Sequence, residues 1–140
     1  MNPSKEVFHC FELILIVTAI GDARIVMIGC QSFGNQEFHE HRTELTKHLI
    51  SDKGFNAIAL GADFPDVLHL HRYVQGITKD EHEAMSCFNK FPWWANRNMS
   101  NFKFIRWLHD HNQNIKYTVE KIKARPAERV KLQEASIMTC

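Results

Sequence analysis

The sequence predicts an α/β fold: a small parallel sheet with flanking helices, forming an incomplete part of a larger domain. Two short runs rich in β-branched and small apolar residues, at 24–29 and 55–60, have the length and composition of buried strands. A segment with helical periodicity follows each run. The order strand, helix, strand, helix is typical of βαβ units, so we expect the two strands to be parallel neighbours joined by a right-handed crossover.

Capping residues predict where the helices begin and end. The first helix is expected over about 35–53, because Gly54 can adopt the left-handed conformation that ends helices. Its core-facing stripe is expected to hold Phe38, Arg42, Leu45 and Leu49. The second helix is expected to begin after Asp63, which suits the N-cap, with Pro65 in its first turn and Gly76 at its end. Its buried stripe is expected to hold Val67, Leu70, His71 and Val74.

The rest of the chain offers no further strand pattern. A third helix is expected over about 99–112. On one of its faces lie Phe104, Trp107 and Leu108. Residues 118–140 are basic and polar, and we expect a divergent tail there, solvated or disordered. Parallel sheets need cover on both faces and rarely consist of two strands, so residues 1–117 are expected to form a truncated domain.

Composition argues against several classes of partner. Of the 140 residues, 44% are hydrophobic and 24% are charged, which is typical of a globular chain. The net charge of +1 gives no field that would attract nucleic acid or a membrane. The four cysteines form no CxxC pair, which favours a reducing cytoplasm over a disulfide scaffold. The apolar segment 11–20 contains Glu12 and is about half as long as a membrane span. We expect a packing helix there, with a weak signal peptide as the alternative.

Several separated motifs match one known protein family. After the first strand the matching residues are Gly29, Ser32, Gly34, Glu37 and Phe38, with Arg42 in the following helix. After the second strand they are Ala62, Asp63, Pro65 and Asp66. Further matches lie in HRYVQG at 71–76 and in FPWWANRN at 91–98. Over 19–112 these motifs resemble the erythromycin-esterase-like family of bacterial hydrolases. That resemblance implies carboxylic ester hydrolysis, best known as the opening of macrolide lactones in the response to antibiotics.

Three positions of this chain depart from the chemistry that the resemblance implies. In the family a histidine acts as general base on a water, supported by acidic groups. Phe33 stands at the position of that histidine, and Cys30 and Gly61 stand at positions of glutamates. A positioned general base is worth roughly 10²–10⁴-fold in rate, and none of the three residues offers a proton acceptor of similar reach. The resemblance therefore implies a truncated pseudoenzyme, which takes a small-molecule ester as substrate only if some activity survives.

Arg42 and Asp63 are retained family positions. The planar guanidinium of Arg42 suits a substrate carbonyl or a carboxylate. Because the family acids are absent, we favour a structural ion pair, for example with Asp63. Asp63 could orient a catalytic group, but its place just before a helix favours capping.

Cys30 and the nine histidines offer alternative chemistry. A thiol at the carboxyl end of a strand can act as a nucleophile if a base lies near it, yet an inert buried thiol is the favoured interpretation. The paired histidines are His39/His41, His69/His71 and His109/His111. Each pair lies two residues apart on a predicted helix, so its members point to different faces and cannot chelate together. We expect no metal site and no cofactor.

The aromatic segment and the sheet edge suggest what the chain could bind. By the resemblance, Trp94 and Arg97 are candidates for substrate binding, although Trp93 and Trp94 suit a core or an exposed patch equally well. One alternative function is a partner-binding or scaffolding fragment, in which a protein partner completes the sheet. Another is half of a split esterase, completed by a second chain.

Overall fold

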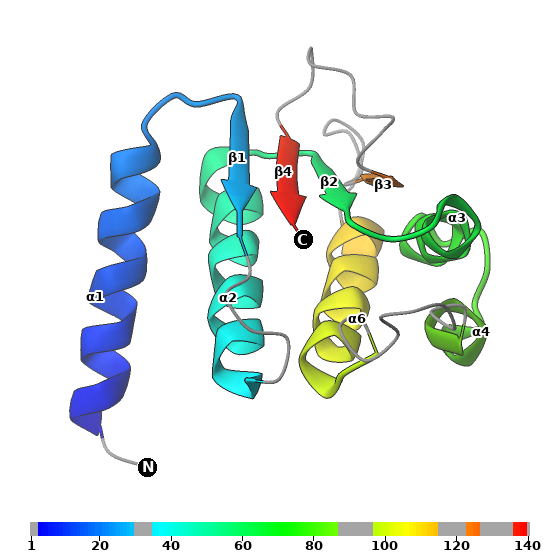
Figure 1. Cartoon of the computed structure of the whole chain (residues 1–140), viewed down its shortest axis with the longest axis horizontal. Coiled ribbons are helices and arrows are strands. Elements are labelled where there is room, and N and C mark those ends of the chain that lie inside the picture. The colour runs from blue at the N-terminus through cyan, green and yellow to red at the C-terminus, as the bar shows by residue number, and fades with distance from the viewer. Residues whose placement is uncertain (1–2, 30–34, 87–96, 115–122, 127–135, 140) are drawn as a thin grey trace.

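The computed structural model describes residues 3–29, 35–86, 97–114, 123–126 and 136–139 (Figure 1). Most of the described residues are helical. The helices are α1 (Pro3–Ile20), α2 (Gln36–Lys53), α3 (Phe64–Val74), α4 (Glu81–Ser86) and α6 (Met99–Asn114). The strands, each of four residues, are β1 (Ile25–Ile28), β2 (Ala57–Leu60), β3 (Lys123–Pro126) and β4 (Ser136–Thr139).

The strands pair in the order β1-β4-β2-β3, and every pair is parallel. Ser136 at the start of β4 lies opposite Ile25 of β1 on one side and Ala57 of β2 on the other. The prediction that β1 and β2 are direct neighbours is therefore wrong, because β4 lies between them. The prediction that no strand follows the second one is also wrong. The α/β class is confirmed only in part, since helices predominate and the strands are very short.

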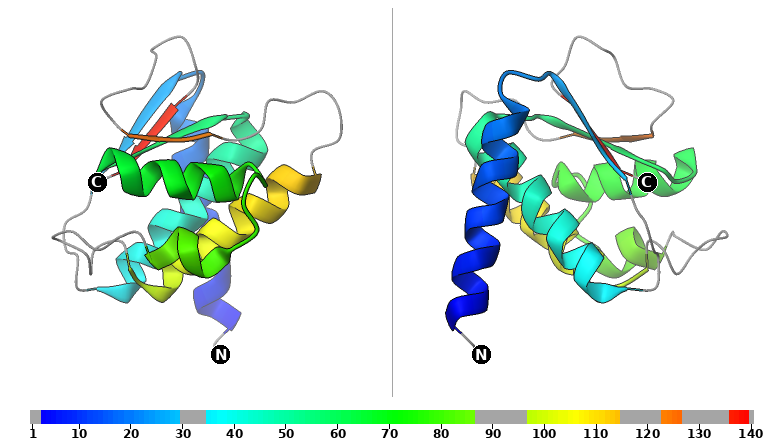
Figure 2. Two further views of the ribbon diagram at one scale, coloured as in Figure 1. Left: turned by 90° about the vertical axis from the view of Figure 1, so that its right-hand side faces the viewer. Right: turned by 60° about the vertical axis from the view of Figure 1, so that its left-hand side comes forward.

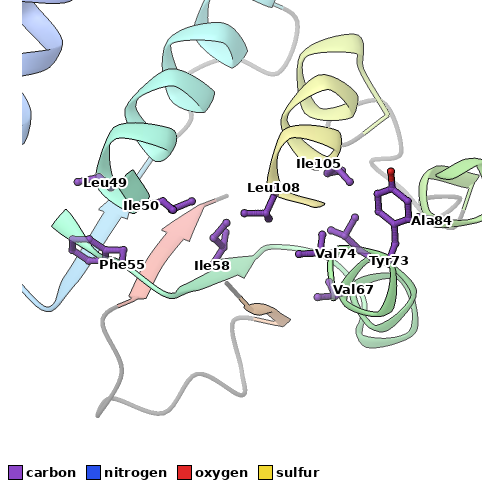
Figure 3. Packing of buried hydrophobic residues seen from close by; sticks show 11 residues of the cluster. Leu49, Ile50, Phe55, Ile58, Val67, Tyr73, Val74, Ala84, Ile105 and Leu108 are labelled. Carbon is purple, nitrogen blue, oxygen red and sulfur yellow. The ribbon is translucent and has the colours of Figure 1, made fainter. Parts of the chain in front are cut away.

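One face of the strands is covered by helices. Figure 2 shows α2, α3 and α6 on the same side of them. Between helices and strands lies a core of buried side chains, which are drawn as sticks in Figure 3. Its members are Leu49, Ile50, Phe55, Ile58, Val67, Leu70, Tyr73, Val74, Ala84, Ile105 and Leu108. Strand β2 is buried over Ala57, Ile58 and Ala59, as befits a strand with neighbours on both sides, whereas Met27 of β1 is 79% exposed.

Local capping fixes the ends of α2 close to where the sequence predicted them. Asn35 is the N-cap, and its side-chain oxygen accepts a hydrogen bond of 2.9 Å from the backbone N–H of Glu37. Gly54 closes the helix with a φ of 72°, in the left-handed region that favours glycine. Its N–H donates to the carbonyl of Ile50, which satisfies a group of the last turn.

The buried face of α2 differs from the predicted stripe. The buried residues of this helix are His39, Thr43, Thr46, Leu49 and Ile50. Phe38 is 44% exposed, and Arg42 and Leu45 are half-buried, so of the predicted stripe only Leu49 is fully buried. Two buried threonines return their hydroxyl hydrogen bonds to the backbone of the preceding turn. Because these hydroxyl groups are satisfied locally, a polar face of the helix can pack inward. A prediction based on the spacing of apolar residues does not anticipate this.

The buried residues of α3 mostly agree with the prediction, whereas those of α6 agree with the predicted face only at Leu108. In α3 the buried residues are Val67, Leu70, Tyr73 and Val74. The prediction included His71 in this buried set, and the structure has Tyr73 there instead. His71 is half-buried. In α6 the buried residues are Ser100, Ile105, Leu108 and Asn112, while Phe104 and Trp107 pack half-buried against the core.

The first helix, α1, lies beside α2 (Figure 1). Leu13 and Val17, one turn apart, are buried, as expected of a packing helix. The side chains between them are exposed: Ile14 by 52%, Leu15 by 56% and Ile16 by 46%. Within the described ranges, no helix combines the length and the apolar character that crossing a bilayer requires.

Candidate functional site

The carboxyl ends of β1 and β2 are where an open parallel sheet places its ligand site. Strand β1 ends at Ile28, and the predicted site positions Cys30 and Phe33 lie outside the described residues. Strand β2 ends at Leu60, and a tight turn follows, in which the N–H of Ala62 donates to the Leu60 carbonyl at 2.9 Å. Gly61 in this turn is exposed, and it presents no side chain to the site.

Asp63 follows this turn and occupies the N-cap of α3. Its backbone is extended and its carbonyl accepts from Val67, yet its side chain makes no capping hydrogen bond. The expectation that its carboxylate caps the helix is therefore correct for position and wrong for the bond. Pro65 in the first turn lacks an N–H, which leaves one donor fewer for a cap to satisfy. The carboxylate of Asp63 is exposed at this edge.

Arg42 is the predicted site residue with the best-defined surroundings. Its Nη2 lies 3.0 Å from Nδ1 of His39, one turn earlier on α2, and donates at 3.4 Å to Oδ1 of Asn101 on α6. The guanidinium thus links α2, the helix that follows β1 in sequence, to α6. The ion pair between Arg42 and Asp63 stays a prediction.

Asn98 places Asn101 against Arg42. The side-chain oxygen of Asn98 accepts from the backbone N–H of Asn101 at 2.9 Å, and its carbonyl accepts from Phe102 at 3.0 Å. This is the N-cap geometry for α6, which begins at the next residue. Asn98, a residue of the FPWWANRN motif, therefore has a structural role in this chain. Of the two predicted substrate-binding residues, Arg97 is exposed, and Trp94 lies outside the described residues.

His39 and Asn101 are site residues that sequence reasoning missed. The sequence pattern groups His39 with His41 as an ordinary helical pair, yet His39 is only 4% exposed while His41 is exposed. The signal that could have found His39 is its spacing, because residues three apart on a helix are neighbours and Arg42 follows at that distance. Asn101 could not have been found, because its contact with Arg42 depends on how α2 and α6 pack.

The histidine pairs point to different faces, as predicted. On α6, the ring of His109 stacks on Tyr73 at a centroid distance of 4.6 Å, and that of His111 stacks on Trp107 at 4.9 Å. Burial lowers the pKa of His111, because the charged imidazolium loses water there. In the part of the chain that the structure describes, no three His, Cys, Asp or Glu side chains come together as metal ligands.

Solved structures share this arrangement of elements. A protein from Bacillus cereus matches 76% of this chain with a TM-score of 0.65 and 22% identity. A succinoglycan biosynthesis protein matches 79% with a TM-score of 0.66 and 22% identity. At this identity the likeness shows the fold alone. The chain spans 24% and 27% of the length of these two proteins, about a quarter of each.

The sequence carries the family assignment. The erythromycin esterase family matches residues 50–122, more than half of the chain. The chain therefore belongs to the erythromycin esterase family. The matched segment includes Gly61, Asp63, Trp94 and Arg97, whereas Cys30, Phe33 and Arg42 precede it.

Proposed function

We propose that this chain is a pseudoenzyme of the erythromycin esterase family, which keeps a ligand-holding arginine but not the groups that hydrolyse esters. The observation that carries the proposal is the exposed turn at Gly61, where the resemblance puts a glutamate and this chain has no side chain. Phe33 and Cys30 replace the other two titratable groups. The expected location is the cytoplasm, which the scattered cysteines support. The family resemblance suggests a bacterial source.

Loss of all three groups removes the proton transfers on which the family reaction depends. Water attacks an ester carbonyl slowly unless a base takes up its proton, and one positioned base contributes roughly 10²–10⁴-fold. Groups that act as a unit are not additive, so the first loss removes most of the rate. The described histidine nearest in sequence to this turn is His69, which is exposed on α3.

Arg42 supports a binding role. A guanidinium presents planar N–H donors that match the oxygens of a carboxylate or a carbonyl. In this chain the side chain is half-buried and is held by partners on two helices. A cation fixed in this way needs little reordering when it meets an oxygen ligand, which favours binding. We therefore propose small carboxylates and esters as the ligand class.

Hydrolysis of p-nitrophenyl butyrate tests the proposal. The unmodified chain is compared with a variant carrying Cys30→Glu, Phe33→His and Gly61→Glu together, and with Arg42→Ala. We expect no turnover by the unmodified chain above that of Arg42→Ala or of buffer. Turnover by the unmodified chain that Arg42→Ala abolishes would overturn the proposal, and Cys30→Ala would then show whether the thiol is the nucleophile.

A partner-binding function is the second candidate. Three consecutive residues of α1, Ile14, Leu15 and Ile16, are each about half exposed, and Met27 of β1 is exposed by 79%. Such surfaces favour a protein partner that covers α1 or extends the sheet, including the second chain of a split esterase. Light scattering tests this candidate. The candidate is supported if the chain self-associates or co-elutes with a partner, and if Leu15→Lys disrupts that association. A monomer without partners counts against it.

A further inference from the structure

His39 is a buried histidine in contact with a guanidinium. It lies at the inward face of α2 and is 4% exposed. Its Nδ1 lies 3.0 Å from Nη2 of Arg42, within hydrogen-bond distance. Apolar packing alone does not explain why a buried imidazole lies in contact with the charged side chain of Arg42. The contact constrains the chemistry of both side chains.

The contact fixes the tautomer of His39. Arginine has five N–H donors and no acceptor, so in this bond Nη2 donates and Nδ1 accepts. Nδ1 must then carry no proton, and the neutral ring carries its proton on Nε2. A protonated imidazolium has N–H donors at both nitrogens, so it could not accept this hydrogen bond. Its positive charge would also repel the guanidinium.

A second acceptor holds the same guanidinium nitrogen. Oδ1 of Asn101 lies 3.4 Å from Nη2, and the backbone of Asn101 is itself fixed by Asn98 at the start of α6. Two acceptors on different helices restrict rotation of the guanidinium about its own chain. A free arginine side chain samples many rotamers, and a bound ligand must otherwise restrict them.

We propose that His39 is a positioning residue: its neutral imidazole holds the Arg42 guanidinium in the orientation that receives a carboxylate or an ester carbonyl. This inference rests on the binding role proposed for Arg42. It assigns the orientation of Arg42 to a contact within α2, supported by Asn101 of α6, rather than to the loops at the strand ends. His39 acts through Arg42 and does not itself contact the ligand.

The tautomer can be measured without any ligand. Long-range ¹⁵N–¹H correlation spectra of the unmodified chain at neutral pH distinguish protonated from unprotonated ring nitrogens, and His39→Asn identifies the His39 signals. We expect an unprotonated Nδ1 and a protonated Nε2. A protonated Nδ1 in His39 would overturn the proposal, whatever the ligand affinity.

A matched pair of variants tests the positioning. His39→Asn keeps an acceptor one bond beyond Cγ, as Nδ1 is, whereas His39→Leu fills a similar volume without an acceptor. Benzoate serves as the carboxylate probe, and Arg42 side-chain NMR signals report the guanidinium. We expect His39→Leu to weaken benzoate binding roughly tenfold and to broaden or shift the Arg42 signals, because a hydrogen bond to a charged group is lost. His39→Asn should retain most of both.

The two proposals fail in different ways. If benzoate does not bind the unmodified chain, or if Arg42→Lys leaves its binding unchanged, the ligand-holding role of Arg42 falls. If His39→Leu folds and leaves the Arg42 signals and the affinity unchanged, the positioning role of His39 falls. If His39→Leu does not fold, His39→Asn decides: Arg42 signals like those of the unmodified chain support the proposal, and mobile ones overturn it.

Discussion

Asn112 of α6 donates a hydrogen bond from its Nδ2 to the backbone carbonyl of Val74, the last residue of α3, at 3.0 Å, and both residues are fully buried. The final carbonyls of a helix have no partner within the helix. Here a side chain from a neighbouring helix supplies one. The bond therefore ties the end of α3 to α6, within the core that supports the candidate site.

Replacing Asn112 is expected to destabilise the fold. Asn112→Ala removes the donor and leaves the buried Val74 carbonyl without it, which costs about 1–3 kcal/mol of unfolding free energy. Urea unfolding followed by circular dichroism measures the change. Asn114→Ala, at the exposed end of the same helix, is the control and should shift the midpoint little. Equal effects of the two substitutions would contradict the role assigned to this bond.

Two glycines test the cost of left-handed backbone. Gly54 has a φ of 72°, and a Cβ added there would meet open space, whereas Gly76 has a φ of 74° with the amide of Gln113 close by. Because an L-residue with a side chain is strained in this region, Gly54→Ala and Gly76→Ala should each cost about 1–2 kcal/mol. Thermal melts of both variants measure these costs.

The neighbour of Gly76 separates backbone strain from crowding. Gln113 is exposed, so its flexible end can move away from an added methyl group. Adding Gln113→Ala to Gly76→Ala should therefore recover only a small part of the lost stability. Full recovery in the double variant would show that crowding, and not the positive φ, makes Gly76 necessary.

The N-cap of α2 gives a third prediction. Asn35→Ala removes the acceptor for the N–H of Glu37 and should cost about 1 kcal/mol, whereas Asn35→Ser keeps an acceptor and should cost less than half of that. Chemical unfolding of the two variants side by side measures the difference. If alanine and serine are equivalent at this position, the side-chain cap does not contribute.

His111 makes stability depend on pH. Burial lowers its pKa in the folded state, so the unfolded chain binds the proton more readily. Its contribution is fully present above the unfolded value of about 6.5 and is lost as the pH falls through the lower folded pKa. His111→Phe keeps a ring against Trp107 and cannot titrate. The free energy of unfolding of this variant should fall less between about pH 7.5 and pH 5 than that of the unmodified chain. Parallel pH profiles would refute the assignment to His111.

Sequence reasoning located most helix boundaries because capping is local. Asn35 and Gly54 mark the two ends of α2, and Gly76 follows the end of α3, through bonds that span only a few residues. Strand order could not be predicted in the same way. Pairing is non-local, and Lys123–Pro126 contains a lysine, an arginine and a proline, none of which favours a strand.

The candidate site was predictable only where it depends on single positions. The resemblance identified Arg42, Asp63 and Gly61, but not the partners of Arg42. Tyr73 is buried in place of the predicted His71, and the ring of Tyr73 stacks on His109 of α6. Like the contact with Asn101, this packing depends on how α6 crosses its neighbours, which periodicity along one helix does not specify.

We propose that Phe33, Cys30 and Gly61 leave this member of the erythromycin esterase family without hydrolytic chemistry. The most direct measurement is to incubate erythromycin with the purified, unmodified chain and follow the macrolide by mass spectrometry. We predict no species heavier by one water above the level in buffer. Ring-opened erythromycin that forms in proportion to protein concentration, and that Arg42→Ala abolishes, would contradict the claim.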